Sequence, residues 1–204
     1  MHRTLLSAVV LLCSTALACS GNVDDEDKAR LAYLGLDNGI ARAMQLGFDG
    51  FNAADSANIP TQTADGDVSG TMSISGQVDQ GSSANKGMRL SMALDDYADD
   101  PVHPVDENGE ERDEEYEIHY DTGSAVTVNF SLRDIPDGTM TGDISGTVTM
   151  TGDLEGELEL NLSLDGKIEQ DPDDATKTRR ESGTTSISGT ATSDFGEYRV
   201  DITR

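Results

Sequence analysis

Apolar and polar residues alternate without a break between Gly138 and Ile168. Every even-numbered position from Met140 is apolar or glycine, and every odd-numbered position is Thr, Ser, Asp, Glu, Asn or Lys. A period of two places one set of side chains on a buried face of a β-sheet and the other set in water. The pattern therefore predicts β-structure with one apolar and one polar face across the whole segment.

This segment is too long for one ordinary strand, so we expect a β-hairpin. The unbroken parity requires a loop with an odd number of residues, because an even-numbered loop would shift the phase between the paired strands. A loop centred on Asp153 places Gly146 opposite Leu160 and Gly142 opposite Leu164. Each pair sets a small residue against a large one, which favours close packing.

Shorter stretches of the same alternation predict further strands along the chain. Their approximate ranges are 68–78, 88–94, 116–120, 126–132, 187–191 and 198–202. The apolar positions change from odd-numbered to even-numbered between the last two ranges. This change indicates an even-numbered loop near Phe195 and places Gly189 opposite Ile202. The segments SGTMSISG, SGTVTMTG and SGTTSISG, at 69–76, 145–152 and 182–189, resemble one another. Either duplication of a strand pair or the abundance of Ser, Gly and Thr in these strands explains the resemblance.

Residues 24–54 have a different period and predict a helix. Apolar residues recur every three or four positions, and acidic residues crowd the first turn, where they interact favourably with the helix dipole. A second row contains Gly35, Gly39, Ala43 and Gly47 at a spacing of four. Because each glycine costs about 1 kcal/mol in a helix, the row indicates close approach of another backbone segment. A turn at 37–39, dividing the segment into two short helices, is the alternative.

Together these elements predict an all-β fold with one N-terminal helix. We expect about eight antiparallel, meandering strands that form a curved sheet or barrel packed around the helix, with residues 24–204 as a single domain. A linker is expected at 52–66, an acidic loop at 95–115 and a second polar break at 171–181.

Five methionines share the inward face of the predicted strands with Leu, Val, Ile and Gly. They are Met72, Met88, Met92, Met140 and Met150. Methionine adapts to irregular space, and glycine leaves room on a curved sheet. These residues are therefore candidates for the lining of a pocket for an apolar, lipid-like ligand. The alternative is that the N-terminal helix fills the concave face and leaves no pocket.

The charge of the chain narrows the choice of partners. Its formal net charge is −25 at pH 7. Binding to phosphate backbones depends on Lys and Arg, so we expect no nucleic-acid partner. The same negative charge opposes docking of the domain body onto anionic lipid.

Residues 1–18 have the features of an export signal. His2 and Arg3 provide a short basic region, residues 5–12 are apolar, and small residues stand at Ala16 and Ala18. This arrangement is typical of a cleaved signal peptide. The apolar run is too short to span a bilayer.

The next residue, Cys19, makes this segment resemble the lipobox-type signal peptide of bacterial lipoproteins. In that family the cysteine thiol receives a diacylglycerol, the signal is removed before the cysteine, and the new amine is usually acylated, as with palmitate. The resemblance implies a lipidated tether at 19–23, and Ser20 implies sorting to the outer membrane. The segment departs from the commonest pattern, which has Leu at the position of Ala16 and a small residue at that of Leu17. Ordinary cleavage after Ala18, which would release a soluble protein, is the alternative.

No arrangement of residues predicts catalysis. The chain has no G-x-S-x-G, H-E-x-x-H or P-loop motif, and the predicted processing leaves no free thiol. We expect His119 to be solvated on the polar face of a strand, whereas His103 is a conceivable metal ligand. In the acidic loop, Asp106, Asn108 and Glu110 loosely resemble a calcium-binding loop and are candidates for weak Ca²⁺ binding. A solvated run of charge is the alternative.

The sequence thus predicts a lipoprotein anchored in the outer membrane through Cys19, on the periplasmic or the cell-surface side. We expect a structural or interaction role, with no enzymatic activity and no cofactor, and the protein partner or lipid ligand is not identified. A carrier or sensor of an apolar ligand is the alternative, and an envelope enzyme is a third hypothesis.

Overall fold

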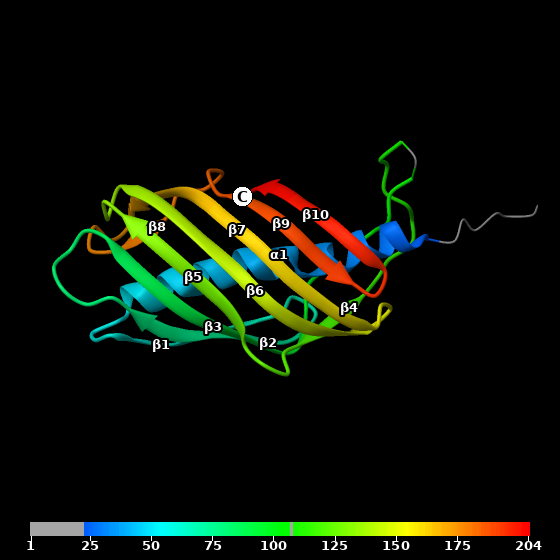
Figure 1. Cartoon of the computed structure of the whole chain (residues 1–204), viewed down its shortest axis with the longest axis horizontal. Coiled ribbons are helices and arrows are strands. Elements are labelled where there is room, and N and C mark those ends of the chain that lie inside the picture. The colour runs from blue at the N-terminus through cyan, green and yellow to red at the C-terminus, as the bar shows by residue number, and fades with distance from the viewer. Residues whose placement is uncertain (1–22, 107) are drawn as a thin grey trace, which may run out of the picture.

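One helix and ten strands make up the described part of the chain, residues 23–106 and 108–204 of a computed structural model (Figure 1). The predicted signal peptide and Cys19 lie outside these residues. Helix α1 spans Asp25–Asn52. The strands are β1 (Asn58–Asp65), β2 (Ser69–Val78), β3 (Lys86–Ala98), β4 (Ile118–Asp121), β5 (Val126–Arg133), β6 (Gly138–Gly152), β7 (Gly156–Gln170), β8 (Thr178–Arg180), β9 (Ser186–Ser193) and β10 (Gly196–Thr203). The predicted all-β fold with one N-terminal helix is confirmed, with ten strands in place of about eight.

All ten strands belong to one antiparallel sheet with the order β1-β2-β3-β4-β6-β7-β9-β10. β4 and β5 follow one another between β3 and β6, and β8 pairs with the end of β7 that lies beyond β9. Strands that are neighbours in the sheet are therefore close in sequence, which is the predicted meander. Among the described residues no ladder joins β1 to β10, so the sheet is open and these strands form its two edges.

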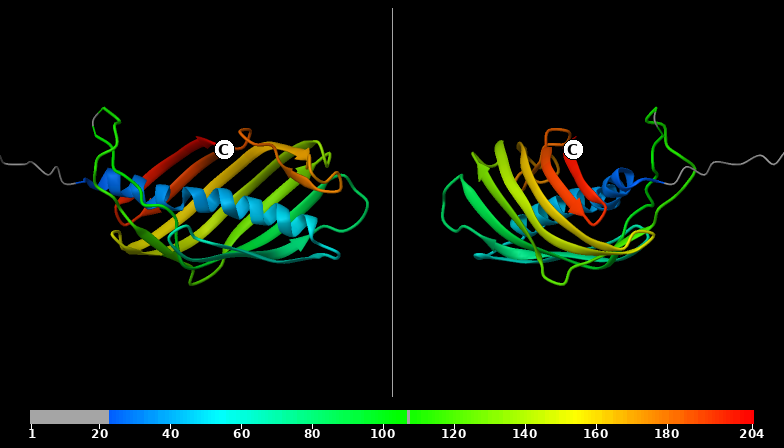
Figure 2. Two further views of the ribbon diagram at one scale, coloured as in Figure 1. Left: turned by 180° about the vertical axis from the view of Figure 1, so that it is seen from behind. Right: turned by 45° about the vertical axis from the view of Figure 1, so that its right-hand side comes forward.

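Helix α1 lies along the concave side of the sheet (Figure 2). Asp24 caps its N-terminus, where the carboxylate accepts a hydrogen bond of 2.9 Å from the Asp27 N–H. The apolar residues of α1 complete the core, and the helix contacts both edge strands as well as β2. The prediction of one continuous helix is confirmed, because α1 runs through residues 37–39 without a turn.

The row of small residues on α1 faces the sheet. A Cβ atom at Gly35 would lie 2.5 Å from the Tyr120 hydroxyl oxygen, and one at Gly47 would lie 2.9 Å from a methyl carbon of Leu90. Both distances are shorter than van der Waals contact, so larger side chains would push the helix away from the sheet. The close approach predicted from this row is present, but sheet side chains, not a second backbone, make it.

The long central hairpin has the predicted register. The loop between β6 and β7 contains three residues, 153–155. Gly146 faces Leu160, and Gly142 faces Leu164. The odd-numbered loop expected from the alternation is confirmed, and so is the pairing of the two fifteen-residue strands expected from a turn centred on Asp153.

The glycines of the three similar segments adopt backbone conformations that other residues rarely adopt. Gly76 has φ +156° and Gly189 has φ +143°, and a Cβ atom on either would lie 2.1 Å from a carbonyl oxygen of the neighbouring strand. The other glycines of these segments also have positive φ: Gly70, Gly146, Gly152 and Gly183. A shared need for backbone freedom and for space is thus a physical reason why the segments resemble one another.

Two of the segments predicted to be irregular contain strands. The linker predicted at 52–66 includes the edge strand β1, whose sequence NIPTQTAD does not alternate. Its register with β2 shifts between Ile59 and Gln62, around Pro60, so one face is not buried regularly. The polar break predicted at 171–181 includes β8, which has only three residues and is too short for a period to be recognised.

Two further boundaries differ from the prediction. The acidic loop begins at Asp99 rather than Asp95, because β3 continues to Ala98. In the last hairpin the loop is even-numbered as predicted, but it lies at 194–195 and places Gly189 opposite Val200 instead of Ile202.

Candidate functional site

The five inward-facing methionines lie in the core between sheet and helix. Each has a relative exposure of 0–1 %. The side chain of Met72 lies against Gly39 of α1, and that of Met88 lies near Gly47. The helix thus occupies the concave face that the sequence offered as a candidate pocket. An apolar ligand in contact with these methionines would have to displace α1.

Two buried carboxylates connect the helix to the sheet. Asp37 on α1 accepts a hydrogen bond of 3.0 Å from the Tyr33 hydroxyl and forms an ion pair with Arg204, which follows β10. Burial raises the pKa of Tyr33, and the Arg204 charge opposes this only in part. Tyr33 therefore remains a neutral hydrogen-bond donor at physiological pH.

The second carboxylate, Asp99, follows β3 and is 4 % exposed. It accepts hydrogen bonds of 2.8 and 2.9 Å from the Tyr97 hydroxyl, and Arg42 of α1 lies 3.4 Å away. Arg42 also contacts Asp67 in a bidentate pair and donates to the Asp65 carbonyl. Burial and the hydrogen bond to Asp99 raise the pKa of Tyr97. Because their donors and acceptors are paired with one another, both clusters serve to hold helix and sheet together.

The acidic loop forms an irregular hairpin that projects from the sheet at the N-terminal end of α1 (Figures 1 and 2). Bridges between Val102 and Tyr116 and between Val105 and Glu111 hold its two arms together. His103 lies in one arm, with Nδ1 3.1 Å from the Glu114 carbonyl oxygen. The hairpin therefore has local structure of its own.

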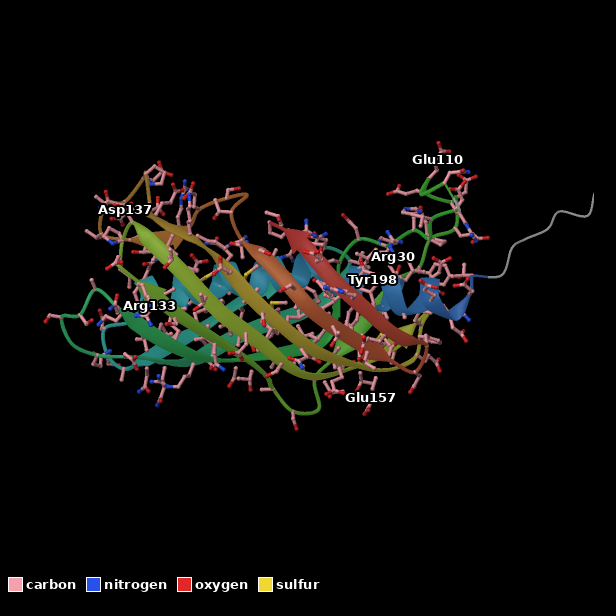
Figure 3. All side chains as sticks on the ribbon, turned by 45° about the horizontal axis from the view of Figure 1, so that its top comes forward. Arg30, Glu110, Arg133, Asp137, Glu157 and Tyr198 are labelled. Atoms are coloured by element: carbon pink, nitrogen blue, oxygen red, sulfur yellow. The ribbon has the colours of Figure 1, made fainter. Side chains whose placement is uncertain are left out.

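The candidate calcium ligands lie at the tip of this hairpin, where Figure 3 labels Glu110. One carboxylate oxygen of Asp106 accepts backbone N–H bonds from Asn108 and Glu110, at 2.8 and 2.9 Å. These bonds, that from Glu110 first, lower the pKa of Asp106. The carboxylate thus closes a turn. In the residues that the structure describes, no three His, Cys, Asp or Glu side chains are grouped so as to hold a metal ion. Weak Ca²⁺ binding stays a prediction.

A polar cluster on the convex face surrounds His119 of β4. Its Nδ1 lies 2.9 Å from Asp96 Oδ1 and its Nε2 lies 2.9 Å from Glu117 Oε1. Ser69 Oγ is 3.2 Å from Nδ1 and donates a hydrogen bond of 2.8 Å to the Asp96 carbonyl. The side chain of His119 is only 21 % exposed. The expected solvated histidine is instead held between two carboxylates from different parts of the sheet.

The direction in which the pKa of His119 is shifted follows from this arrangement. Its partial burial lowers its pKa, but the hydrogen bonds and charges of Glu117 and Asp96 outweigh that effect, so the pKa is raised above the ordinary value of 6.5. When it is protonated, the imidazolium donates to a carboxylate from each nitrogen and joins β4 to the end of β3.

A serine, a histidine and carboxylates in contact suggest nucleophilic catalysis, but their geometry does not support it. The Ser69 hydroxyl donates to the Asp96 carbonyl, so its proton is not directed at the imidazole. The nitrogen nearest Ser69 faces the Asp96 carboxylate and is not free to act as a base. The cluster is therefore an ion-paired clamp between strands.

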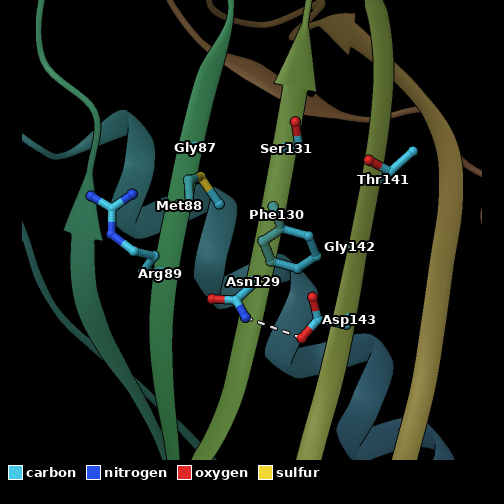
Figure 4. Close-up of a pocket in the computed structure, with 9 residues that line it drawn as sticks. All are labelled: Gly87, Met88, Arg89, Asn129, Phe130, Ser131, Thr141, Gly142 and Asp143. Atoms are coloured by element: carbon cyan, nitrogen blue, oxygen red, sulfur yellow. Dashed lines mark hydrogen bonds between the residues drawn. The ribbon is translucent and has the colours of Figure 1, made fainter.

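A shallow depression lies on the convex face of β3, β5 and β6, with a volume of about 350 Å³ (Figure 4). Gly87 and Gly142 contribute to its floor, and Asn129 donates a hydrogen bond of 3.0 Å to Asp143 across it. Arg89, the one cation in its lining, is paired with Asp79 at 2.9 Å. Asn129 and Arg89 are thus paired with neighbouring carboxylates, and the lining has no unpaired cation with which to fix an anionic ligand.

No protein family, curated protein or solved structure matches this chain in the three comparisons. Its function is therefore inferred from its own residues and geometry. Within residues 23–106 and 108–204, no helix is both long enough and apolar enough to cross a membrane.

Proposed function

We propose that this protein is a lipoprotein anchored in the outer membrane through acyl chains on Cys19, with a structural or interaction role. The observation that carries the proposal is the N-terminal segment, in which a short basic region, an apolar run and Ala16-Leu17-Ala18 directly precede Cys19. Two or three acyl chains give stable anchoring, whereas a single chain is marginal.

The position of Cys19 determines which end of the domain lies close to the membrane. Asp24, the cap of α1, is five residues after Cys19. Five residues of extended chain reach at most about 18 Å, so an anchor at Cys19 holds the N-terminal end of α1 near the leaflet. The acidic hairpin lies at the same end (Figure 2). The whole chain has a formal net charge of −25, and anionic headgroups repel such a body, which favours a domain that projects from the surface over one that lies flat on it.

The packing of the core supports a structural or interaction role over ligand transport. α1 occupies the concave face, and the five methionines are buried against it. The charged clusters around His119 and Asp99 are internally paired, so neither provides a reactive group. The surfaces available for recognition are the acidic hairpin, the convex face and the edges of the sheet.

Intact mass of the protein recovered from membranes tests the anchor. We expect a species that begins at Cys19 and carries the added mass of a diacylglycerol and usually of one more acyl chain, found in the outer-membrane fraction. Cys19→Ala abolishes the modification and membrane association, while the matched control Cys13→Ala changes neither. An unmodified N-terminal cysteine in the wild-type protein would overturn the proposal.

The sorting part of the proposal has its own test. In the lipoprotein family, Asp after the lipidated cysteine leads to retention in the inner membrane. We therefore expect Ser20→Asp to move the acylated protein from the outer to the inner membrane, with its mass changed only by the substitution. Unchanged fractionation would contradict outer-membrane sorting by Ser20 and leave the lipid anchor itself intact.

A further inference from the structure

The two edges of the sheet differ in how well they are protected against pairing with another strand. On β1, Pro60 removes a backbone donor and the register is broken between Ile59 and Gln62. Side chains also occupy its carbonyl groups, because Gln62 donates to the Pro60 carbonyl and Arg42 to the Asp65 carbonyl. β1 is thus an edge that other strands pair with poorly.

β10 has none of these protections. It pairs with β9 through eight consecutive residues without a register shift. It contains no proline and no bulge, and it runs along the outside of the sheet (Figure 1). Phe195, Tyr198 and Ile202 are only partly buried at this edge, so apolar surface lies beside it. Figure 3 labels Tyr198 on this strand.

The hydrogen-bond pattern identifies which backbone groups of β10 are available. Arg204 and Thr185 exchange both N–H···O bonds, at 2.8 and 3.0 Å. Bonded pairs alternate in an antiparallel ladder, so the even-numbered residues of β10 bond to β9. The N–H and C=O groups of the odd-numbered residues, Glu197, Arg199, Asp201 and Thr203, point away from the sheet. Among the described residues, none of these groups has a hydrogen-bond partner.

The side chains of the same odd-numbered residues are complementary to themselves in one antiparallel register. If Val200 faces Val200 of a second copy, then Arg199 faces Asp201, and Glu197 faces Thr203. The outward N–H and C=O groups of these residues then meet as bonded pairs, because all of them are odd-numbered. On the inner face the same register sets Tyr198 against Ile202, an aromatic and β-branched pair that favours cross-strand packing.

The neighbouring registers are less favourable. A shift that centres the axis on Arg199 sets Arg199 against Arg199 and Glu197 against Asp201, so every charged pair is repulsive. Shifts by an odd number of residues bring the outward backbone groups of one strand opposite groups that face β9 in the other. Of these registers, only the one centred on Val200 both brings the outward backbone groups together as bonded pairs and sets opposite charges against one another.

We propose that the free edge of β10 pairs antiparallel with β10 of a second copy of this chain, about a two-fold axis at Val200, to form one continuous sheet. The interface is isologous and consists mainly of backbone hydrogen bonds, with two symmetric Arg199–Asp201 pairs on the convex face. It is small, so the dissociation constant is on the order of micromolar. This inference is independent of the lipid anchor.

Sedimentation equilibrium of the full chain at physiological ionic strength tests the dimer. Detergent is included to solvate any acyl chains, and all variants keep the same N-terminus. We expect a monomer–dimer equilibrium for the wild type. Asp201→Pro removes an outward N–H and no bond to β9, so it weakens dimerisation at least about tenfold while the far-UV circular dichroism is unchanged. A wild type that is monomeric at all concentrations, or a folded proline variant that dimerises like the wild type, overturns the proposal.

Charge exchange tests the register without affecting the backbone. Arg199→Asp and Asp201→Arg each place like charges opposite one another and weaken dimerisation roughly fivefold, whereas the double exchange restores it. Lys167→Asp on the outward face of β7 is the matched control for Arg199→Asp, with the same change of charge, and we expect it to leave the dimer intact. Failure of the double exchange to restore dimerisation would overturn the register about Val200.

Discussion

Gly35 on α1 provides the most direct test of how the helix packs into the sheet. Replacing it with alanine favours the helix by about 1 kcal/mol, because alanine has the higher helix propensity. The new Cβ atom, however, would lie 2.5 Å from the Tyr120 hydroxyl oxygen. Tyr120 is fully buried, and its hydroxyl donates a hydrogen bond of 2.8 Å to the Ala32 carbonyl. The ring has no space into which it can move.

The magnitude follows from these contacts. Overpacking in a well-filled core costs about 1–3 kcal/mol, and loss of the Tyr120 hydrogen bond adds about 1 kcal/mol. Against the gain in helix propensity, we expect Gly35→Ala to destabilise the protein by about 1–3 kcal/mol. In a Tyr120→Phe background the colliding oxygen is absent, and the closest remaining contacts are 3.3 Å to Ile118 and 3.4 Å to the ring. There the same substitution is neutral or slightly stabilising.

Urea denaturation followed by far-UV circular dichroism measures the four proteins of this double-mutant cycle, since the chain has no tryptophan. We expect a coupling free energy of about 2 kcal/mol between the two sites. Gly47→Ala, on the same helix three turns away, is the control and adds to Tyr120→Phe without coupling. If Gly35→Ala costs the same in both backgrounds, the Tyr120 hydroxyl does not limit the approach of the helix.

Three further predictions concern the polar clusters and the glycines. Because the folded-state pKa of His119 is raised, its contribution to stability is complete below the ordinary value of 6.5 and is lost as the pH rises through the raised pKa. The stability lost in His119→Gln is therefore greater at about pH 6 than at about pH 8.5, and a pH-independent difference in denaturant midpoint would contradict this sign. Arg204→Ala leaves Asp37, whose side chain is 8 % exposed, without its cation and costs about 1–3 kcal/mol. Adding Asp37→Asn recovers part of that loss, and denaturant unfolding that shows no recovery would argue against the ion pair. Gly189→Ala destabilises by about 2 kcal/mol or more, and Gly81→Ala, where φ is positive but no atom lies within 4 Å, costs less by the same assay.

The sequence predicted those parts of the fold that repeat with a short period. In β6 and β7 the alternation assigns each residue to a face and requires an odd-numbered loop, and a turn centred on Asp153 then sets Gly146 opposite Leu160 and Gly142 opposite Leu164. β1 was missed because an edge strand around Pro60 buries its face irregularly. The error at Gly189 has a similar origin, since a loop placed one residue late shifts the pairing by two residues without changing which face is apolar.

The polar clusters were less predictable because their members come together through the register of distant strands. Ser69, Asp96 and His119 lie on β2, β3 and β4, and a slip of two residues in either pairing would separate them. Asp96 also has φ +48°, so its side chain does not follow the alternation of β3. The sequence around His119 gave no indication that its side chain would contact a carboxylate on another strand. The row of small residues on α1, by contrast, could be recognised in the sequence because its members are only four residues apart.

The position of α1 inside an open sheet also has a consequence for the rate of folding. Tyr33 of the helix packs against Tyr198 of β10, with ring centroids 5.6 Å apart although 165 residues (198 − 33) separate them along the chain. Contacts of such high sequence separation form slowly, because loop closure must precede them. We therefore expect the helix to contact β1 and β2 before β9 and β10 complete the opposite side of the sheet. We expect the apolar side of α1 that later meets β10 to be uncovered during that interval, and exposed apolar surface makes a folding chain prone to aggregate.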